Sequence, residues 1–244
     1  MGARWDIDKM GTLYLIPSPL ADGPLDGTLP NGTLAQISLL RYFVVEELRT
    51  VRRYLSKAGL KGQIEDIQLF VLNEHTKTEE LDLMFQPLLD GNDMGLLSEA
   101  GLPCVADPGA VLVAMAHQKG IKVAPLSGPS SLMLALMASG MNGQSFAFAG
   151  YLSVDSGLRK AQIKLLEKRA IQENQTQIFM ETPYRNLALF KDLMEVCSPQ
   201  TLLCIAANLT TSDAFIATKT ITQWRSNSLP HLNKVPVIFI IGRL

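Results

Sequence analysis

GLLSEAGLPCVADPG, at residues 95–109, and KGIKVAPLSGPSS, at residues 119–131, are the two stretches that decide the fold of this chain. In each, a short apolar run ends in a loop of glycine and proline that leads into a helical pattern. Such a loop leaves backbone N–H and C=O groups open to a ligand at the carboxyl edge of a sheet, because no bulky side chain covers them. These two loops predict either a small-molecule site formed mainly by backbone groups or two ordinary turns between strands and helices.

Strand and helix patterns alternate through the first half of the chain. We expect strands at residues 12–16, 42–45, 66–72, 94–97 and 121–126, and helices at residues 34–40, 46–58, 78–90 and 111–118. This alternation is typical of a mostly parallel sheet with helices on both faces. The first half is therefore predicted to be an α/β domain.

The second half has more strands and fewer helices between them. Strands are expected at residues 145–152, 177–181, 202–206, 214–222 and 236–241, and long helices at residues 157–173 and 184–196. This pattern predicts a second α/β domain with a mixed sheet. We place the boundary near Ser127, which gives domains of residues 10–127 and 128–244 with a bridging helix at residues 129–139. Residues 1–9 are expected to be a leader, with native translation starting at Met10.

The composition is that of an ordinary globular protein, with 47% hydrophobic and 18% charged residues. A formal net charge of −1 makes no global case for nucleic acid, so any RNA contact has to come from local patches. The three cysteines, without a C-x-x-C, favour a reducing cytoplasm over a disulfide framework. We expect no metal site and no membrane span, since neither a zinc pattern nor a long apolar run is present.

Several motifs resemble those of one enzyme superfamily. SEAGLPCVADPG at residues 98–109 and PLSGPSS at residues 125–131 are similar to the S-D-A-G-T-P-x-x-x-D-P-G and P-x-P-G-P-S-A signatures of the tetrapyrrole-methylase-like methyltransferases. Five further matches lie at residues 11–20, 45–49, 73–76, 146–153 and 178–185. Together they cover nearly the whole chain after Met10. The branch that they resemble most is the bacterial 16S rRNA ribose 2′-O-methyltransferases, of which this chain looks like a short, divergent member.

This resemblance implies two α/β domains with S-adenosylmethionine in the cleft between them, and a homodimer. The G-x-G-x-x-G and Walker patterns are both absent, which argues against a dinucleotide or a nucleoside triphosphate. The positions that match the family's cofactor contacts are Pro17, Glu99, Ala100, Gly101, Leu102, Pro103, Ala106, Pro129 and Ser130, with Met180, Leu209 and Pro236 from the second domain.

Four residues are candidates for the chemistry. Glu46 and Arg49 match the Glu and Arg of the family's A-E-D-T-R motif, and His75 and Glu99 lie in loops that follow strands. Glu46, Glu99 or His75 could accept or orient the proton of a ribose hydroxyl, while Arg49 could hold a phosphate. The alternatives are that Glu46 and Glu47 only complement a helix N-terminus and that His75 is simply exposed.

Two rows of basic residues stand out on a nearly neutral chain. One row consists of Arg49, Arg52, Arg53 and Lys57, and the other, into which Arg159 leads, of Lys160, Lys164 and Lys168. Each is either a phosphate-contacting stripe or a solvated helix face. Glu181 with Arg185 is expected to be either a functional pair or a local ion pair. Tyr151 and Tyr184 could stack on a base or pack in the core.

The sequence thus predicts an S-adenosylmethionine-dependent methyltransferase whose acceptor is a ribose 2′-oxygen in ribosomal RNA or the small ribosomal subunit. Departures from the family pattern fall in the substrate loops: residues 208–211 read NLTT in place of E-L-T-K. Two alternatives therefore remain open. One is a methylase of a small molecule or a protein side chain, and the other is a paralogue that binds the cofactor without catalysis.

Overall fold

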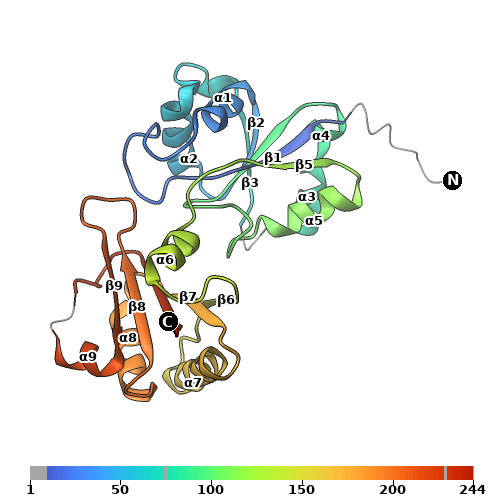
Figure 1. Cartoon of the computed structure of the whole chain (residues 1–244). Helices are drawn as coiled ribbons and strands as arrows, with labels where there is room; N and C mark the ends of the chain where they lie inside the picture. The colour runs from blue at the N-terminus through green and yellow to red at the C-terminus, as the bar shows by residue number, and fades with distance from the viewer. Residues whose placement is uncertain (1–9, 74–75, 228–229, 244) are drawn as a thin grey trace. The chain divides into compact units, whose positions relative to one another are not determined.

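The computed structural model describes residues 10–73, 76–227 and 230–243. The chain divides into two compact units, one that ends at Ser130 and one that begins at Ser131. Each unit carries one five-stranded sheet, and each is described by itself below (Figure 1).

The first unit contains an entirely parallel sheet in the order β3-β2-β4-β1-β5. Its strands are β1 (Thr12–Ile16), β2 (Tyr42–Val45), β3 (Gln68–Val71), β4 (Met94–Leu97) and β5 (Lys122–Pro125). Its helices are α1 (Asn31–Leu39), α2 (Leu48–Leu55), α3 (Thr78–Met84), α4 (Gln86–Leu89) and α5 (Ala110–Gln118). The predicted alternation of strands and helices in a parallel sheet is confirmed.

Helices cover both faces of this sheet, because successive residues of a strand point to opposite sides. Phe43 and Val45 of β2 pack into one buried cluster with residues of α1 and α2. Val44, between them, packs into the other cluster with residues of α3, α4 and α5. Figure 1 shows the two groups of helices on opposite sides of the sheet. Burial on both faces explains why the strands are continuous apolar runs.

Two predicted helices are shorter than their sequence patterns suggest. The predicted helix at residues 46–58 begins at Leu48 and gives way to a π-helical turn at Ser56–Leu60, within which Gly59 has a non-helical φ of 105°. The predicted helix at residues 78–90 is interrupted at Phe85 and continues as α4, whose first turn contains Pro87. Proline suits a first helical turn because it has no N–H to bond there.

The second unit contains a mixed sheet, as predicted, and its strand order is β6-β7-β10-β8-β9. Only β6 and β7 run parallel, and the other neighbours are antiparallel. The strands are β6 (Phe146–Tyr151), β7 (Thr176–Met180), β8 (Leu202–Ala207), β9 (Phe215–Thr220) and β10 (Val237–Gly242). The helices are α6 (Ser131–Ser139), α7 (Ser156–Gln172), α8 (Asn186–Val196) and α9 (Ile221–Ser226).

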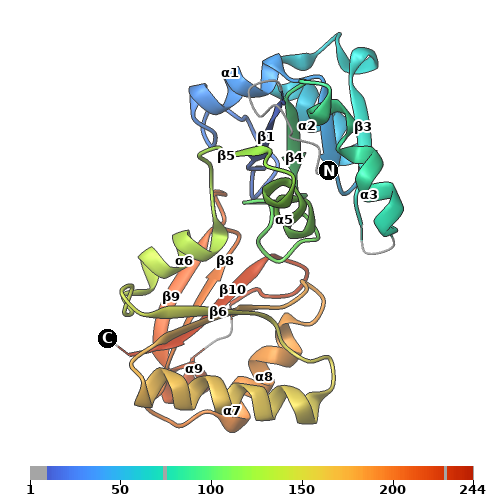
Figure 2. The ribbon, with the colours of Figure 1, turned by 90° about the vertical axis from the view of Figure 1, so that its right-hand side faces the viewer.

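The core of the second unit lies mainly between its sheet and α7, α8 and α9. Phe179 of β7 stacks on Phe239 of β10, with ring centroids 6.0 Å apart, and the indole N–H of Trp224 donates to the Leu203 carbonyl at 2.9 Å. The other face carries α6, and the Thr218 hydroxyl donates to the Ser139 carbonyl at 2.7 Å. Figure 2 shows α7 and α8 on one side of the sheet and α6 on the other.

The expected strand at residues 214–222 is wrong beyond Thr220, where α9 begins. The Thr220 side chain accepts from the Gln223 backbone N–H, and the Gln223 side chain accepts from the Thr220 N–H, which is a capping box. The T-x-x-Q spacing is its sequence signal. Among the described residues, no helix is both long and apolar enough to cross a membrane.

Gly95 in β4 allows the side chains of Ile16 and Phe43 to pack directly against the backbone of this strand. A Cβ at Gly95 would lie 2.5 Å from Ile16 Cδ1 and 2.7 Å from Phe43 Cδ1. We therefore expect Gly95→Ala to lower the free energy of unfolding by about 1–3 kcal/mol, as overpacked cores do. The measurement is the shift in a urea denaturation curve.

Gly27→Ala is the matched control, because a Cβ at Gly27 meets no described atom within 4 Å. It should change the unfolding free energy by no more than about 0.5 kcal/mol. Equal stability of the two variants would show that β4 is not packed as described.

Candidate functional site

The predicted loops of the first unit meet at the carboxyl ends of β1 and β4. The Ser18 N–H donates to the Gly101 carbonyl at 2.8 Å, and the Gly101 N–H donates back to the Ser18 carbonyl at 3.0 Å. The Ser18 hydroxyl donates to the Ser98 carbonyl at 2.7 Å. Three hydrogen bonds thus join the loop after β1 to the loop after β4, and they hold Pro17 and residues 99–101 in one place.

The loop after β5 is fixed to the loop after β1 by close packing. A Cβ at Gly128 would lie only 2.2 Å from Pro17 Cγ, so the two loops approach as closely as glycine allows. The Thr33 hydroxyl of α1 donates to the Ser127 carbonyl at 2.8 Å. Pro17, Pro129 and Ser130 therefore belong to one cluster of loops with Gly101.

The loop after β4 has unusual backbone geometry. Gly101, Cys104 and Ala106 have φ values of 75°, 67° and 64°, in the left-handed region that a side chain normally disfavours. Asp107 holds the loop in this form, because its Oδ1 accepts from the Gly109 N–H at 2.7 Å. Gly101 and Pro103 are buried, Leu102 is half-buried, and Ala100 and Ala106 are exposed. Strain of this kind concentrates at functional sites.

Carboxylates gather beside this loop. Glu46, at the end of β2, accepts from the Glu99 N–H at 3.4 Å. Burial raises the pKa of Glu46, and the negative charges of Asp107 and Glu99 raise it further, against the hydrogen bond from Glu99. Burial also raises the pKa of Asp107, while nearby backbone N–H groups, that of Gly109 first, oppose the rise. The structure thus brings Glu46 and Glu99 together, with Asp107 as a third acidic group.

Glu47, and not Glu46, serves the N-terminus of α2. Its carboxylate accepts from the Arg49 N–H at 2.8 Å and the Thr50 N–H at 2.6 Å, and these bonds lower the pKa of Glu47. The helix-capping role that the sequence offered to both glutamates therefore belongs to Glu47. Arg49 lies exposed in the first turn of the same helix. His75 falls outside the described residues.

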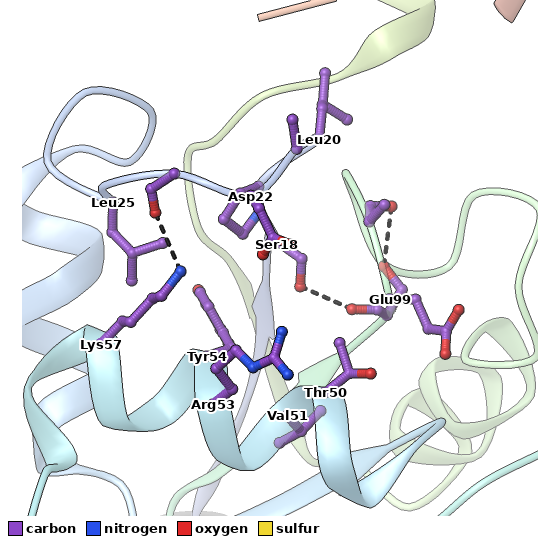
Figure 3. Close-up of a pocket in the computed structure, with 15 residues that line it drawn as sticks. Ser18, Leu20, Asp22, Leu25, Thr50, Val51, Arg53, Tyr54, Lys57 and Glu99 are labelled. Atoms are coloured by element: carbon purple, nitrogen blue, oxygen red, sulfur yellow. Dashed lines mark hydrogen bonds between the residues drawn. The ribbon is translucent and has the colours of Figure 1, made fainter. Parts of the chain in front are cut away.

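A pocket of about 370 Å³ lies against α2 in the same unit. We call it the α2 pocket. Its lining comes from residues 18–23 and Leu25, from Thr50, Val51, Arg53, Tyr54 and Lys57 of α2 and the turn after it, and from residues 98–100. It therefore shares Glu99 and Ala100 with the predicted cofactor loop (Figure 3). The buried Tyr54 hydroxyl donates to the Pro17 carbonyl at 3.0 Å and ties α2 to the loop after β1.

The candidate residues of the second unit lie at one edge of its sheet. Met180 ends β7 opposite Ile238, and the Asn208 N–H donates to the Pro236 carbonyl at 3.1 Å, which brings Met180, Leu209 and Pro236 to the same edge. Asn208, Thr210 and Lys234 near this edge have φ values of 50°, 71° and 61°. These loops repeat the strained backbone of the loop after β4.

The basic residues of α7 lie in different surroundings. Arg159 is only 5% exposed, and its Nε donates to Asp192 Oδ2 at 2.7 Å, so it serves the core of the second unit and cannot reach RNA. Lys160 is paired with Glu195 at 2.7 Å. Lys164 and Lys168 lie on the exposed face of α7. Arg159 is thus buried, whereas Lys164 and Lys168 are exposed to solvent.

The pair of Glu181 and Arg185 is an ion pair, with Nη2 and Oε1 2.6 Å apart. Glu181 is only 4% exposed and its Oε2 has no partner among the described residues. Tyr151 and Tyr184 are exposed, so neither packs in the core.

Sequence reasoning missed the residues that support the site. Ser18, Tyr54, Asp107 and Gly128 hold the loops without belonging to the predicted contacts. Asp107 precedes a Pro-Gly pair, and this Asp-Pro-Gly sequence was a local signal for a turn. The bond from Tyr54 to Pro17 spans 37 residues and left no local signal.

The chain is similar to known proteins over most of its length. The family model for tetrapyrrole (corrin/porphyrin) methylases matches residues 42–224. A Vibrio cholerae protein named ribosomal RNA small subunit methyltransferase I is 32% identical over 81% of this chain and 65% of its own length. The Haemophilus influenzae protein of the same name is 29% identical over 96% of this chain and 79% of its own length. This chain thus spans less than two thirds of the Vibrio protein.

One solved structure has the same fold. The crystal structure of the methyltransferase CobJ aligns with a TM-score of 0.61 and covers 96% of this chain and 94% of that one. The two sequences are 16% identical, so this likeness speaks for the fold alone.

The raised pKa of Glu46 leads to a prediction about stability. A carboxyl whose pKa is higher in the folded than in the unfolded protein destabilises the fold when it is ionised. Glu46→Gln should therefore raise the melting temperature at pH 7. This advantage should shrink as the pH falls through the folded pKa and vanish below the ordinary glutamate value of about 4.3, where the wild-type carboxyl becomes protonated in both states.

Glu47→Gln is the matched control, because the pKa of Glu47 is lowered. This variant should lower the melting temperature at pH 7 and approach the wild type as the pH falls through the carboxyl range. A Glu46→Gln variant that is less stable than the wild type at pH 7 would contradict the description of Glu46.

Proposed function

Because this chain belongs to the tetrapyrrole (corrin/porphyrin) methylase family, we propose that it is an S-adenosylmethionine-dependent methyltransferase of ribosomal RNA. The proposed acceptor is a ribose 2′-oxygen in the small ribosomal subunit. The relatives named as small-subunit rRNA methyltransferases support this substrate. The proposal includes a cytoplasmic location and a homodimer.

The observation that carries the proposal is the cluster of three loops joined at Ser18, Gly101 and Gly128. Their backbones are held by hydrogen bonds and packing within the chain itself, which lowers the entropy cost of ordering them around a ligand. A Cβ at Gly101 would lie 3.3 Å from Leu20 Cδ2 and 3.9 Å from the Pro129 carbonyl oxygen, so a larger side chain at this position would have to displace the joined loops.

The charges beside these loops fit the same ligand. S-adenosylmethionine supplies a methyl group on a cationic sulfonium, and transfer is an in-line displacement that depends mainly on positioning. Glu46 and Asp107 form an acidic side of the loop cluster, and their raised pKa values reflect the cost of holding negative charge there. A cation near them would lower that cost. Pro17, residues 99–103, Ala106, Pro129 and Ser130 are the proposed contacts.

Glu46 is the proposed proton acceptor. A ribose hydroxyl has a high pKa, so a carboxylate with a raised pKa accepts its proton more readily than an ordinary one. Its Oε2 already accepts from the Glu99 N–H, which orients the carboxylate. Arg49 is proposed to hold a phosphate of the acceptor, and His75 stays a proposed alternative base. Met180, Leu209 and Pro236 are proposed contacts of the adenosine part.

A small-molecule acceptor is the second candidate. The α2 pocket, at about 370 Å³, lies within the range of about 300–1,000 Å³ that is usual for small-molecule sites. The NLTT sequence at residues 208–211, which replaces a family motif in a substrate loop, also favours a changed acceptor.

Transfer of a labelled methyl group tests the proposed function. The protein is incubated with labelled S-adenosylmethionine and with small ribosomal subunits, free RNA, protein and small-molecule fractions from a strain that lacks the gene. We expect label in RNA at an alkali-resistant linkage, which indicates a 2′-O-methyl group. Label in the small-molecule or protein fraction would contradict the proposal that RNA is the substrate. The absence of label from every fraction would contradict the proposal that the protein is a methyltransferase.

Two substitutions at Gly101 test the cofactor site. Because its φ is 75°, any side chain costs about 1–2 kcal/mol of strain, so Gly101→Ala controls for strain and Gly101→Arg adds bulk. We expect calorimetry to show S-adenosylmethionine binding to the folded Ala variant and none to the folded Arg variant. Equal affinity of the two folded variants would contradict the placement of the cofactor at this loop.

A further inference from the structure

The α2 pocket has a basic wall that the proposed cofactor contacts do not use. Arg53 and Lys57 lie one turn apart, and both line the pocket. In Figure 3 their side chains rise from α2 and the turn after it toward the loop that carries Ser18 and Asp22. The resemblance to the A-E-D-T-R motif ends at Arg49, so these two cations lie beyond it.

Neither cation of this wall forms an ion pair within the described part of the chain. Arg53 has no hydrogen bond or ion pair with any described residue, and Lys57 donates only to the Gly23 carbonyl, at a long 3.4 Å. Asp22 and Glu99 also line the pocket, but neither forms an ion pair with the two cations within the described residues. The wall is therefore open to an anion.

The hydroxyl of Tyr54 on this wall is already engaged. The Tyr54 hydroxyl donates to the Pro17 carbonyl, and burial raises the pKa of Tyr54, so it stays neutral. Since Tyr54 is fixed and buried, it holds α2 against the loop after β1 and keeps Arg53 and Lys57 on the pocket side. A guanidinium and an ammonium on one wall are well suited to a phosphate, which Arg can bind with two parallel hydrogen bonds.

We propose that the α2 pocket binds a phosphate of the acceptor RNA strand, with Arg53 as its bidentate ligand and Lys57 as a second cation. This inference rests on the proposed function, since it takes RNA to be the acceptor. The pocket shares Glu99 and Ala100 with the proposed cofactor loop, so a phosphate held there positions the strand beside the site of methyl transfer. S-adenosylmethionine carries no phosphate, which leaves the RNA as the source.

Arg53→Gln tests the proposal, with Arg52→Gln as its matched control. Arg52 is the preceding residue of the same helix and is also exposed, but it does not line the pocket. Both variants lose one charge, and both should keep the wild-type melting temperature. Binding of a labelled short single-stranded RNA is followed by fluorescence anisotropy at several salt concentrations, and S-adenosylmethionine binding is followed by calorimetry.

We expect Arg53→Gln to weaken RNA binding on the order of tenfold. The slope of log affinity against log salt should fall by about 0.7, the value for one phosphate contact to a single strand. Lys57→Gln should act in the same direction, and Arg52→Gln should leave RNA affinity and slope near the wild-type values. In methyl transfer to RNA, Arg53→Gln should raise KM, and the affinity for S-adenosylmethionine should be unchanged in all three variants.

Three results with the variants would overturn the subsite alone. Equal losses in Arg52→Gln and Arg53→Gln would show a general basic face and no specific pocket. Unchanged RNA binding in Arg53→Gln, while the wild type methylates RNA, would refute the subsite and leave the proposed function intact. Loss of S-adenosylmethionine affinity in Arg53→Gln would assign the pocket to the cofactor. A wild-type protein that methylates no RNA fraction would instead overturn the proposed function, and the subsite with it.

Discussion

The paired hydrogen bonds between the backbones of Ser18 and Gly101 are the constraint on which the candidate site depends. They require a left-handed residue at position 101, which glycine supplies at little cost. They also bring the loop after β1 to the loop after β4, so that Pro17 lies where Gly128 can pack on it and Tyr54 can bond to it. The parallel sheet brings the ends of β1, β4 and β5 to one side, and these contacts join the loops after those strands into one continuous surface.

Arg53 and Lys57 lie apart from Glu46 and Asp107 on this surface, although Asp22 and Glu99 line the α2 pocket with the two cations. Glu46 and Asp107 lie on the side of the strained loop, and neither lines the α2 pocket. Arg53 and Lys57 line that pocket and have no carboxylate partner among the described residues. An acidic side suits a sulfonium, and a basic side suits a phosphate. This division links the proposed cofactor and the proposed RNA strand to one part of the fold, with the loop at residues 98–100 between the two sides.

Much of this fold was predictable, because strands buried on both faces read as continuous apolar runs, as Met94–Leu97 does. The glycines and prolines likewise located the loops. Side-chain roles were harder, since Glu46 and Glu47 are chemically identical and only the backbone decides which one caps α2. The burial of Arg159 depends on Asp192, which is 33 residues away, and no helical spacing reveals such a partner. From the sequence, Arg53 and Lys57 could be recognised only as part of a basic stripe on a helix. The loop at residues 18–23, which completes the pocket with them, is distant in sequence.

Amide hydrogen exchange with and without S-adenosylmethionine tests most directly whether the joined loops hold the cofactor. If they do, the cofactor should slow exchange at residues 17–20, 98–107 and 126–131, with smaller effects near Met180, Leu209 and Pro236. The outer faces of α3 and α7 should exchange at unchanged rates. Protection confined to other segments, or a protein that binds the cofactor without protection of the loop at residues 98–107, would contradict the account.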